Sequence, residues 1–389
     1  MIRKILIGLG VVVVAVAGAA FAFGPGYLES QFNRVVPHEP YDIPETARAL
    51  HETLQLADLH SDTLLWDRDV LDLGTRGHVD VPRLQQGRVA FQVFSVVTKV
   101  PKGLNYDRNS PDGDMLTGGA ILQAWPPRTW DSLLERALFQ SEKLHRAQEE
   151  APEQLRIVRT RADMARLLAD QEANPKLVGA LLAIEGAHAL EGKFENVQKL
   201  YDAGFRMIGL AHFFDNELGG SMHGIDKGGL TDFGREVVKE LERLGVTVDL
   251  AHASTAVVDD MLDMAARPVV VSHTGVQIVC GNNRNLSDER LRRVAATGGI
   301  IGIGYWEGAI CNFKPEGVVK ALRAAIDIVG VEHVAFGSDY DGATEVYFDA
   351  SELAVLTGEM LKQGFTEEEI RMITGGNVRR FLLENLPPG

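Results

Sequence analysis

Eight short apolar runs recur along the chain, each followed by a longer amphipathic stretch, and this alternation restricts the fold more than any other feature. Several runs are almost continuously hydrophobic, as parallel strands are when helices cover both faces of their sheet. Eight strands alternating with helices in one domain predict an α/β fold, the (β/α)₈ TIM-type barrel. The predicted strands are residues 54–59, 89–97, 177–184, 206–211, 246–251, 268–272, 299–304 and 333–337.

Helix-end signals occur between these runs. Residues 232–244 carry apolar side chains at helical spacing, and Ser254 and Ser287 each precede a helical pattern as capping residues. Residues 315–330 begin with proline and end with glycine, as helices commonly do.

An open doubly wound sheet is the alternative fold for such an alternation. It would favour a nucleotide or phosphate site after one of its strands. The chain has no Gly-x-Gly-x-x-Gly turn after the first strand and no phosphate loop ending in Gly-Lys-Ser/Thr. The barrel is therefore the preferred prediction.

The N-terminus differs from the rest of the chain. Arg3 and Lys4 precede residues 5–23, nineteen residues without a charged or strongly polar side chain. Such a segment predicts a transmembrane helix with its basic end in the cytoplasm. A cleaved signal peptide is the alternative, with residues 20–22 as its cleavage site.

These features divide the chain into three parts. Residues 1–24 are the expected membrane anchor or signal segment, and residues 25–44, rich in proline, are the expected linker. Residues 45–389 form the barrel domain. Either reading of the N-terminus places this domain outside the cytoplasm, in a periplasmic or extracellular compartment.

Charge and cysteine content narrow the environment. The formal net charge is −15, from 39 basic and 54 acidic residues, and such a surface repels phosphate backbones. Nucleic acid is therefore not an expected partner. Cys280 and Cys311 are the two cysteines, which would be buried thiols in a cytosolic enzyme and a reasonable disulfide in an exported one.

Potential metal ligands stand where the predicted strands stop. Six of the eight runs lead into histidine, aspartate or glutamate. The carboxyl ends of barrel strands converge on one mouth, where the catalytic residues of such barrels lie. The residues are His60, Asp62, Glu185, His212, His252, His273 and Asp339.

Five of these residues form a plausible ligand set. His60 and Asp62 are two apart in an extended segment, so both point to one face, and an imidazole beside a carboxylate suits zinc. Glu185 ends an otherwise apolar run and has two oxygens with which to bridge two cations. His252 and His273 follow consecutive strands and could share a second metal. Each alone is more often a surface histidine or half of an ion pair, but five together need a cation.

Nine segments of the chain resemble, in order, the motifs of the renal (membrane) dipeptidase family. The similarity runs from about residue 50 to the C-terminus. It implies a binuclear zinc barrel of the amidohydrolase type, with two zinc ions per chain, dipeptides as substrates and a homodimeric assembly. The segments are LHSDT, HVDVPRLQQG, AIEGAHAL, LAHFFDN, VDLAHAS, PVVVSHTG, CGNNRNLSDERL, VAFGSDYDG and GGNVRRF.

The resemblance also implies a role for each metal ligand. It assigns His60 and Asp62 to one zinc ion, Glu185 to both ions, and His252 and His273 to the other.

Outside the ligand set, the resemblance makes His212 a substrate-facing residue, Arg284 the holder of the substrate carboxylate and Asp339 the proton-transferring acid. It also implies a disulfide between Cys280 and Cys311.

Two of these roles have competing readings in the residues themselves. Asp341 shares a face with Asp339 and is the alternative acid. Arg284 could instead be a surface residue paired with Asp288 or Glu289 at a helix start.

The predicted reaction is zinc-dependent hydrolysis of dipeptides by a metal-bridging hydroxide. His212 would stabilise the oxyanion, and Asp339 would carry the proton to the leaving amine. Another metal-dependent amidohydrolase, a deacylase or a lactam-opening enzyme, is the alternative, and Arg284 favours dipeptides over it. A membrane-tethered binding protein with a dead site is a further alternative, against which all five ligand positions are filled.

Two segments depart from the family pattern. They are the loop FFDNELGGSMHG after His212 and the stretch Tyr305-Trp306-Glu307. Both are expected to line the pocket, so the preferred dipeptide side chains stay open.

Overall fold

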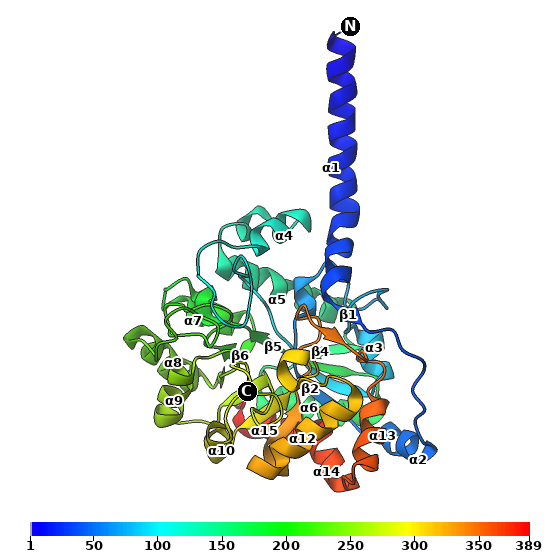
Figure 1. The fold of residues 1–389 in the computed structure, drawn as a ribbon, viewed down its shortest axis with the longest axis vertical. Helices are drawn as coiled ribbons and strands as arrows, with labels where there is room; N and C mark the ends of the chain where they lie inside the picture. The colour runs from blue at the N-terminus through cyan, green and yellow to red at the C-terminus, as the bar shows by residue number, and fades with distance from the viewer. Residues whose placement is uncertain (1) are drawn as a thin grey trace.

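A closed barrel of eight parallel strands forms the body of the protein, in a computed structural model that describes residues 2–389 (Figure 1). Each barrel strand pairs with the next along the chain, and β10 closes the barrel by pairing with β2. The barrel strands are β2 (Leu56–Ser61), β3 (Val89–Phe94), β5 (Val178–Ile184), β6 (Phe205–Gly209), β7 (Thr247–Asp249), β8 (Val270–Thr274), β9 (Ile300–Ile303) and β10 (Val334–Phe336).

The predicted (β/α)₈ barrel is thereby confirmed, and the open doubly wound sheet is wrong. Each predicted apolar run contains or overlaps one barrel strand, with boundaries shifted by a few residues. The strands are buried along almost their whole length, which explains why their sequences lack polar alternation.

Helices surround the barrel and bury one face each against it. In α8 the buried side chains include Val237, Val238 and Leu241. The predicted caps are present: the Ser254 hydroxyl accepts the Val257 N–H at 3.0 Å, and the Ser287 hydroxyl accepts the Arg290 N–H. The larger helices are α5 (Leu133–Glu150), α6 (Arg161–Ala173), α8 (Asp232–Leu244), α9 (Thr255–Met264), α10 (Asp288–Ala296), α12 (Pro315–Val329), α13 (Ala354–Lys362) and α15 (Asn377–Asn385).

Shorter elements decorate this frame. β1 and β11 pair in parallel outside the barrel, and β4 pairs with β5. These elements are β1 (Arg34–Val35), α2 (Glu45–Glu52), α3 (Val81–Gln86), α4 (Leu116–Leu122), β4 (Leu155–Ile157), α7 (Asn196–Asp202), α11 (Glu307–Ile310), β11 (Glu345–Val346) and α14 (Glu367–Arg371).

The N-terminal helix α1 (Ile2–Phe32) projects away from the barrel (Figure 1). It continues past Pro25, so the first part of the predicted linker is helical. Among residues 2–389, no helix combines the length and the apolar character that crossing a membrane requires. The transmembrane helix expected within residues 1–24 is therefore not supported.

Candidate active site

The carboxyl ends of the barrel strands bring the predicted site residues into one buried cluster. His60 lies in β2 and His273 in β8, while Glu185 directly follows β5. These strands are far apart in sequence, but parallel pairing places all their carboxyl ends at the same mouth. The cluster contains His60, Asp62, Glu185, His212, His252, His273, Arg284 and Asp339, each at most 8 % exposed.

Glu185 lies at the centre of the histidines. Its Oε1 is 2.8 Å from His252 Nε2, 3.2 Å from His273 Nε2 and 3.8 Å from His60 Nε2. Its Oε2 is 3.2 Å from His212 Nε2. One carboxylate therefore faces side chains from four other strand ends, as a ligand shared by two cations must.

Three groups of side chains bring potential ligand atoms within 4.8 Å of one another. The first, His60, Asp62 and Glu185, agrees with the ligand set predicted for one metal ion. The second contains Glu185 and His252 together with His212, so His212 lies as close to the shared carboxylate as a ligand would.

The third group contains His60 and His273 with Asp249, which sequence reasoning missed. The Ser272 hydroxyl lies between these three side chains and holds them together. Its Oγ donates to Asp249 Oδ2 at 2.5 Å and lies 2.8 Å from His273 Nδ1 and 3.4 Å from His60 Nδ1.

The Ser272 hydroxyl fixes the tautomers of both histidines. Its one hydrogen is donated to Asp249, so its lone pairs accept hydrogen from the two Nδ1 atoms. With hydrogen on Nδ1 of both rings, Nε2 is the nitrogen through which His60 and His273 would bind a metal ion, which takes the place of any proton there. Asp249 acts through Ser272 and orients the ligands from behind.

Electrostatics in the cluster favour a bound cation. Burial, with the charge of Asp62 added, raises the pKa of Glu185 well above its ordinary value. Burial lowers the pKa of His60, but Asp62 and Glu185 outweigh burial and bring it to about 10. Glu185 and His60 therefore hold their protons more tightly in the metal-free cluster. A divalent cation would displace these protons and balance the same negative charge.

The hydrogen-bond inventory fits the same ion. His60 Nε2 and Asp62 Oδ1 are buried 3.5 Å apart, at the distance of an ion pair, and neither makes a hydrogen bond within the described residues. Unpartnered buried polar atoms are costly, and a metal ion would satisfy both. Imidazoles and carboxylates are among the groups that bind zinc in proteins.

Asp339 and Asp341 have different surroundings. Asp341 accepts hydrogen bonds from Thr63 Oγ1 at 2.8 Å, Arg68 Nη2 at 2.7 Å and the His78 N–H at 2.7 Å. Burial alone would raise the pKa of Asp341, but Arg68 and His78 hold it below its ordinary value. Asp341 is therefore an ionised structural acid.

Asp339 lies inside the cluster, with Oδ1 3.8 Å from His60 Nε2. Burial, with Asp62 opposing its ionisation, raises its pKa to about 7 despite His60 and Arg284. Asp339 and Asp341 have φ values of 61° and 62°, in the left-handed region. Such backbone costs about 1–3 kcal/mol per residue and persists only where the surroundings hold it.

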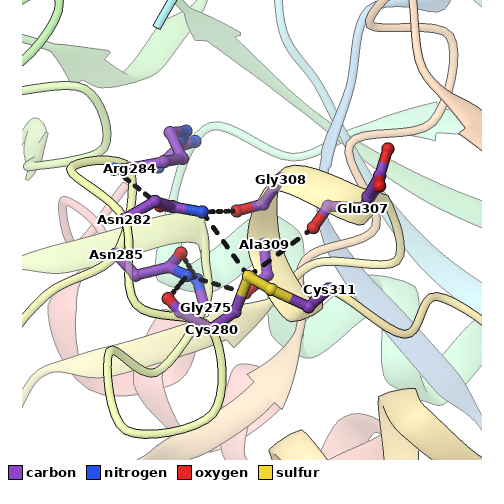
Figure 2. The surroundings of a disulfide bond; sticks show 9 residues. All are labelled: Gly275, Cys280, Asn282, Arg284, Asn285, Glu307, Gly308, Ala309 and Cys311. Atoms are coloured by element: carbon purple, nitrogen blue, oxygen red, sulfur yellow. Dashed lines mark hydrogen bonds between the residues drawn. A yellow bond between two sulfur atoms is a disulfide. The ribbon is translucent and has the colours of Figure 1, made fainter. Parts of the chain in front are cut away.

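The predicted disulfide is present and belongs to the loop that carries Arg284 (Figure 2). Cys280 and Cys311 have Cα atoms 5.4 Å apart and close a loop of 31 residues. Such a bridge stabilises by about 3–4 kcal/mol in the chain-entropy model. Asn282 Oδ1 accepts the Arg284 N–H at 2.9 Å, and Asn282 Nδ2 donates to Gly308 O at 2.8 Å.

Arg284 is buried without a carboxylate partner among the described residues. It is 1 % exposed, and its Nη2 donates to His273 O at 2.9 Å. Its Nη1 is buried and has no hydrogen-bond partner, while the guanidinium carbon lies 5.2 Å from the Trp306 ring centre. The alternative of a surface arginine paired with Asp288 or Glu289 is wrong, since Arg284 is buried and forms no ion pair with either residue among the described residues.

An aromatic wall beside the histidines was not predicted. Phe213 stacks on His223 and Tyr106, with ring centres 4.6 and 6.1 Å away. The Tyr106 hydroxyl accepts a hydrogen bond from Trp306 Nε1 at 3.0 Å. The sequence held one signal of this wall, the two segments that depart from the family pattern. They contain Phe213, His223 and Trp306. Tyr106 had no such signal, because it lies in a long insertion after β3.

Comparisons with known proteins agree with this geometry. The sequence model of the membrane dipeptidase family, peptidase family M19, matches residues 44–385. A metallopeptidase from Rhodobacter sphaeroides, solved with a phosphinate mimic of the dipeptide L-Ala-D-Ala, is 26 % identical with a TM-score of 0.69. The alignment covers 86 % of this chain and 99 % of that one.

Two further structures share the fold at lower identity. A structure described as dipeptidase AC, a family M19 metallopeptidase, is 24 % identical with a TM-score of 0.72, covering 87 % of this chain and all of that one. The probable dipeptidase PvdM from Pseudomonas aeruginosa is 18 % identical with a TM-score of 0.71. The alignment covers 88 % of this chain and 98 % of that one.

Proposed function

Because the chain belongs to the membrane dipeptidase family, peptidase family M19, and is a metal-dependent dipeptidase, we propose that its centre holds two zinc ions. His60 and Asp62 hold one ion, His252 and His273 hold the other, and Glu185 is shared. Two observations support this assignment. His60 Nε2 and Asp62 Oδ1 approach to 3.5 Å without a hydrogen bond from any described residue, and Glu185 lies at the centre of the histidines.

The bound ions supply an activated water and polarise the scissile carbonyl. His212 is buried, and burial together with nearby histidines lowers its pKa well below the ordinary value. A neutral imidazole in that position has one N–H to donate to the oxygen that becomes negative. Asp339, whose pKa burial raises to about 7, is placed to take the proton of the attacking water and to deliver it to the leaving amine.

Arg284 carries the choice of substrate. It is a buried, permanently charged guanidinium whose Nη1 has no hydrogen-bond partner, and it lies 3.4 Å from His252 Nε2 through its other terminal nitrogen. A planar two-pronged donor beside the metal ligands fits the free carboxylate of a dipeptide. A deacylase or lactam-opening enzyme would not need this group, so these alternatives are not favoured.

Replacing Arg284 with lysine is expected to raise KM for free dipeptides at least ~10-fold, since an ammonium cannot reproduce the two-pronged contact. Dipeptide amides should be poor substrates of the native enzyme and should change little. The measurement is steady-state kinetics on L,L and L,D dipeptides and their amides.

Arg292→Lys is the matched control, because Arg292 is exposed on α10 and pairs there with Asp288, away from the candidate site. It should leave KM unchanged. Native enzyme that cleaves amides and acids equally well would refute the carboxylate contact and revive the broader amidohydrolase reading.

We also propose that the barrel works outside the cytoplasm, with the disulfide as the supporting observation. Disulfides persist in oxidising compartments and are rare in the cytosol. Protein isolated from its native host, denatured without reductant, is expected to contain no titratable thiol. Two free thiols per chain would contradict both the bridge and the location.

A further inference from the structure

One face of α1 is buried where the helix ends at the barrel. Pro25 and Glu29 in α1 and Asn33, the residue directly after it, are buried at intervals of four, while Tyr27 and Gln31 between them are exposed. This spacing gives a single helical stripe. Two of the three residues are polar, so the contact with the barrel combines apolar packing with hydrogen bonds.

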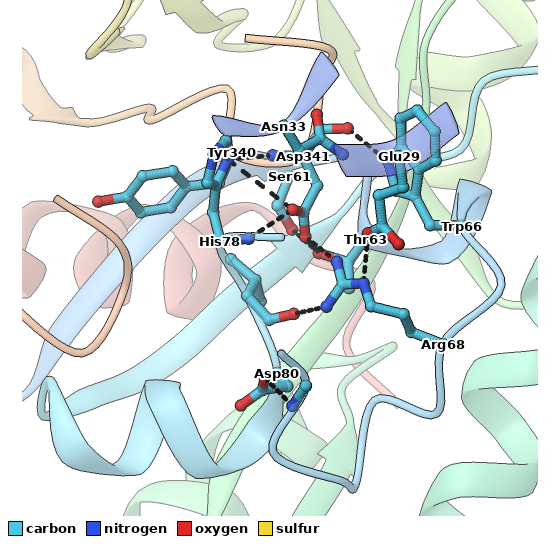
Figure 3. A network of polar contacts seen from close by, with 12 residues as sticks. Glu29, Asn33, Ser61, Thr63, Trp66, Arg68, His78, Asp80, Tyr340 and Asp341 are labelled. Carbon is cyan, nitrogen blue, oxygen red and sulfur yellow. Dashed lines mark hydrogen bonds and ion pairs between the residues drawn. The ribbon is translucent and has the colours of Figure 1, made fainter. Parts of the chain in front are cut away.

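Glu29 lies between two arginines, Arg68 and Arg76, the first of which is drawn in Figure 3. Its carboxylate is 1 % exposed and accepts hydrogen bonds from Arg68 Nε and Arg76 Nε, both at 2.5 Å. Arg68 also donates through Nη2 to Asp341 Oδ2 at 2.7 Å. Arg68 therefore links a carboxylate of α1 to a carboxylate two residues beyond Asp339.

Asn33 contacts the same loop directly. Its Oδ1 accepts the N–H of Ala343 at 2.9 Å, and β1, which follows it, pairs with β11. Ala343 has a φ of 58° and thus shares the left-handed backbone of Asp339 and Asp341.

Every second residue from 339 to 343 is strained, so the loop needs contacts that define it. Thr63 and the backbone of His78 supply some of these contacts at Asp341 from within the barrel domain. Trp66 adds another from the barrel domain by donating to Asp341 O at 2.7 Å. The N-terminal segment contributes through Glu29, which contacts Arg68, and through Asn33, which contacts the loop directly.

We propose that Glu29 and Asn33 are positioning residues for the reaction, holding residues 339–346 so that Asp339 faces the metal ligands. The end of α1 is then part of the active enzyme, although it precedes the region that matches the family. The inference rests on the proposed role of Asp339 in proton transfer.

The test uses Glu29→Gln and Asn33→Ala in the full, metal-loaded chain, with Gln31→Ala as the control on the exposed face of the same helix. Each of the two variants is expected to lower kcat by about 10-fold or more, the usual scale for residues that orient a catalytic group. KM for dipeptides and the metal content should stay unchanged, because Arg284 and the ligands are not touched. Hydrogen exchange of the amides of residues 341–346 should accelerate in both variants and not in the control.

Two results would overturn the proposal. One is unchanged kcat and unchanged exchange of residues 341–346 in both variants. The other is a joint loss of kcat, KM and metal content with faster exchange throughout the barrel, which would mean that the contact serves stability alone. If native enzyme loaded with metal cleaves no dipeptide, the proposed function fails, and the exchange of residues 341–346 still decides the inference.

Discussion

Replacing Glu185 with glutamine is expected to empty both metal positions together and to reduce turnover on the order of 10³-fold or more, because the metals supply the nucleophile and polarise the carbonyl. Glutamine has nearly the same shape and keeps one carbonyl oxygen, so the barrel should stay folded. It lacks the negative charge that lies 2.8–3.8 Å from three histidines. Elemental analysis after dialysis to remove unbound metal measures the metal content, and a dipeptide hydrolysis assay measures the turnover.

Glu195→Gln is the control for this change, because Glu195 is an exposed glutamate in the segment that follows Glu185. It should retain full metal content and turnover. Loss of a single ion from Glu185→Gln, with substantial turnover remaining, would show that the carboxylate serves one position only.

Replacing Asp339 with asparagine is expected to lower turnover at least ~10²-fold with both metals still bound, the scale of a lost general acid–base group. Asparagine is nearly isosteric and is among the residues that best tolerate a left-handed backbone, so the loop should survive. What the change removes is the ability to accept and release a proton. Single-turnover kinetics on metal-loaded variant, beside elemental analysis, separates this loss from a loss of metal.

Asp341→Asn provides the comparison for Asp339→Asn. It weakens an acceptor that binds Arg68 and Thr63, so it should lower thermal stability. By loosening the loop it should also lower turnover, but less than Asp339→Asn does. Near-normal turnover of Asp339→Asn, combined with a collapse in Asp341→Asn, would move the proton-transferring role to Asp341.

The barrel could be predicted because each strand is buried on both faces and therefore reads as a short apolar run. The predicted strand ends differ from the observed ones because apolar runs extend past the hydrogen-bonded segments. The run at residues 246–251, for example, continues beyond β7, Thr247–Asp249. The end of α1 could not be predicted. Gly24, Pro25 and Gly26 favour a linker, and the helix persists through them where Glu29 and Asn33 dock against the barrel.

The candidate metal ligands could be predicted from the sequence for a topological reason. Parallel strands place all their carboxyl ends at one mouth, so a histidine at the end of one run is near a glutamate at the end of another. The supporting residues were hidden, because Ser272 contacts His60 across 212 positions and Arg68 contacts Asp341 across 273. No local pattern reports such contacts. For the same reason the sequence could not decide whether Asp339 or Asp341 is the proton-transferring acid, since the partners that distinguish them are distant in sequence.

A crystal structure of the zinc-loaded enzyme, with anomalous data collected at the zinc edge, tests the two-metal centre most directly. We expect two anomalous peaks per chain, one between His60, Asp62 and Glu185 and the other between Glu185, His252 and His273. A single peak in fully active enzyme, or a peak held by Asp249 between His60 and His273, would contradict the shared role of Glu185 and the proposed ligand set.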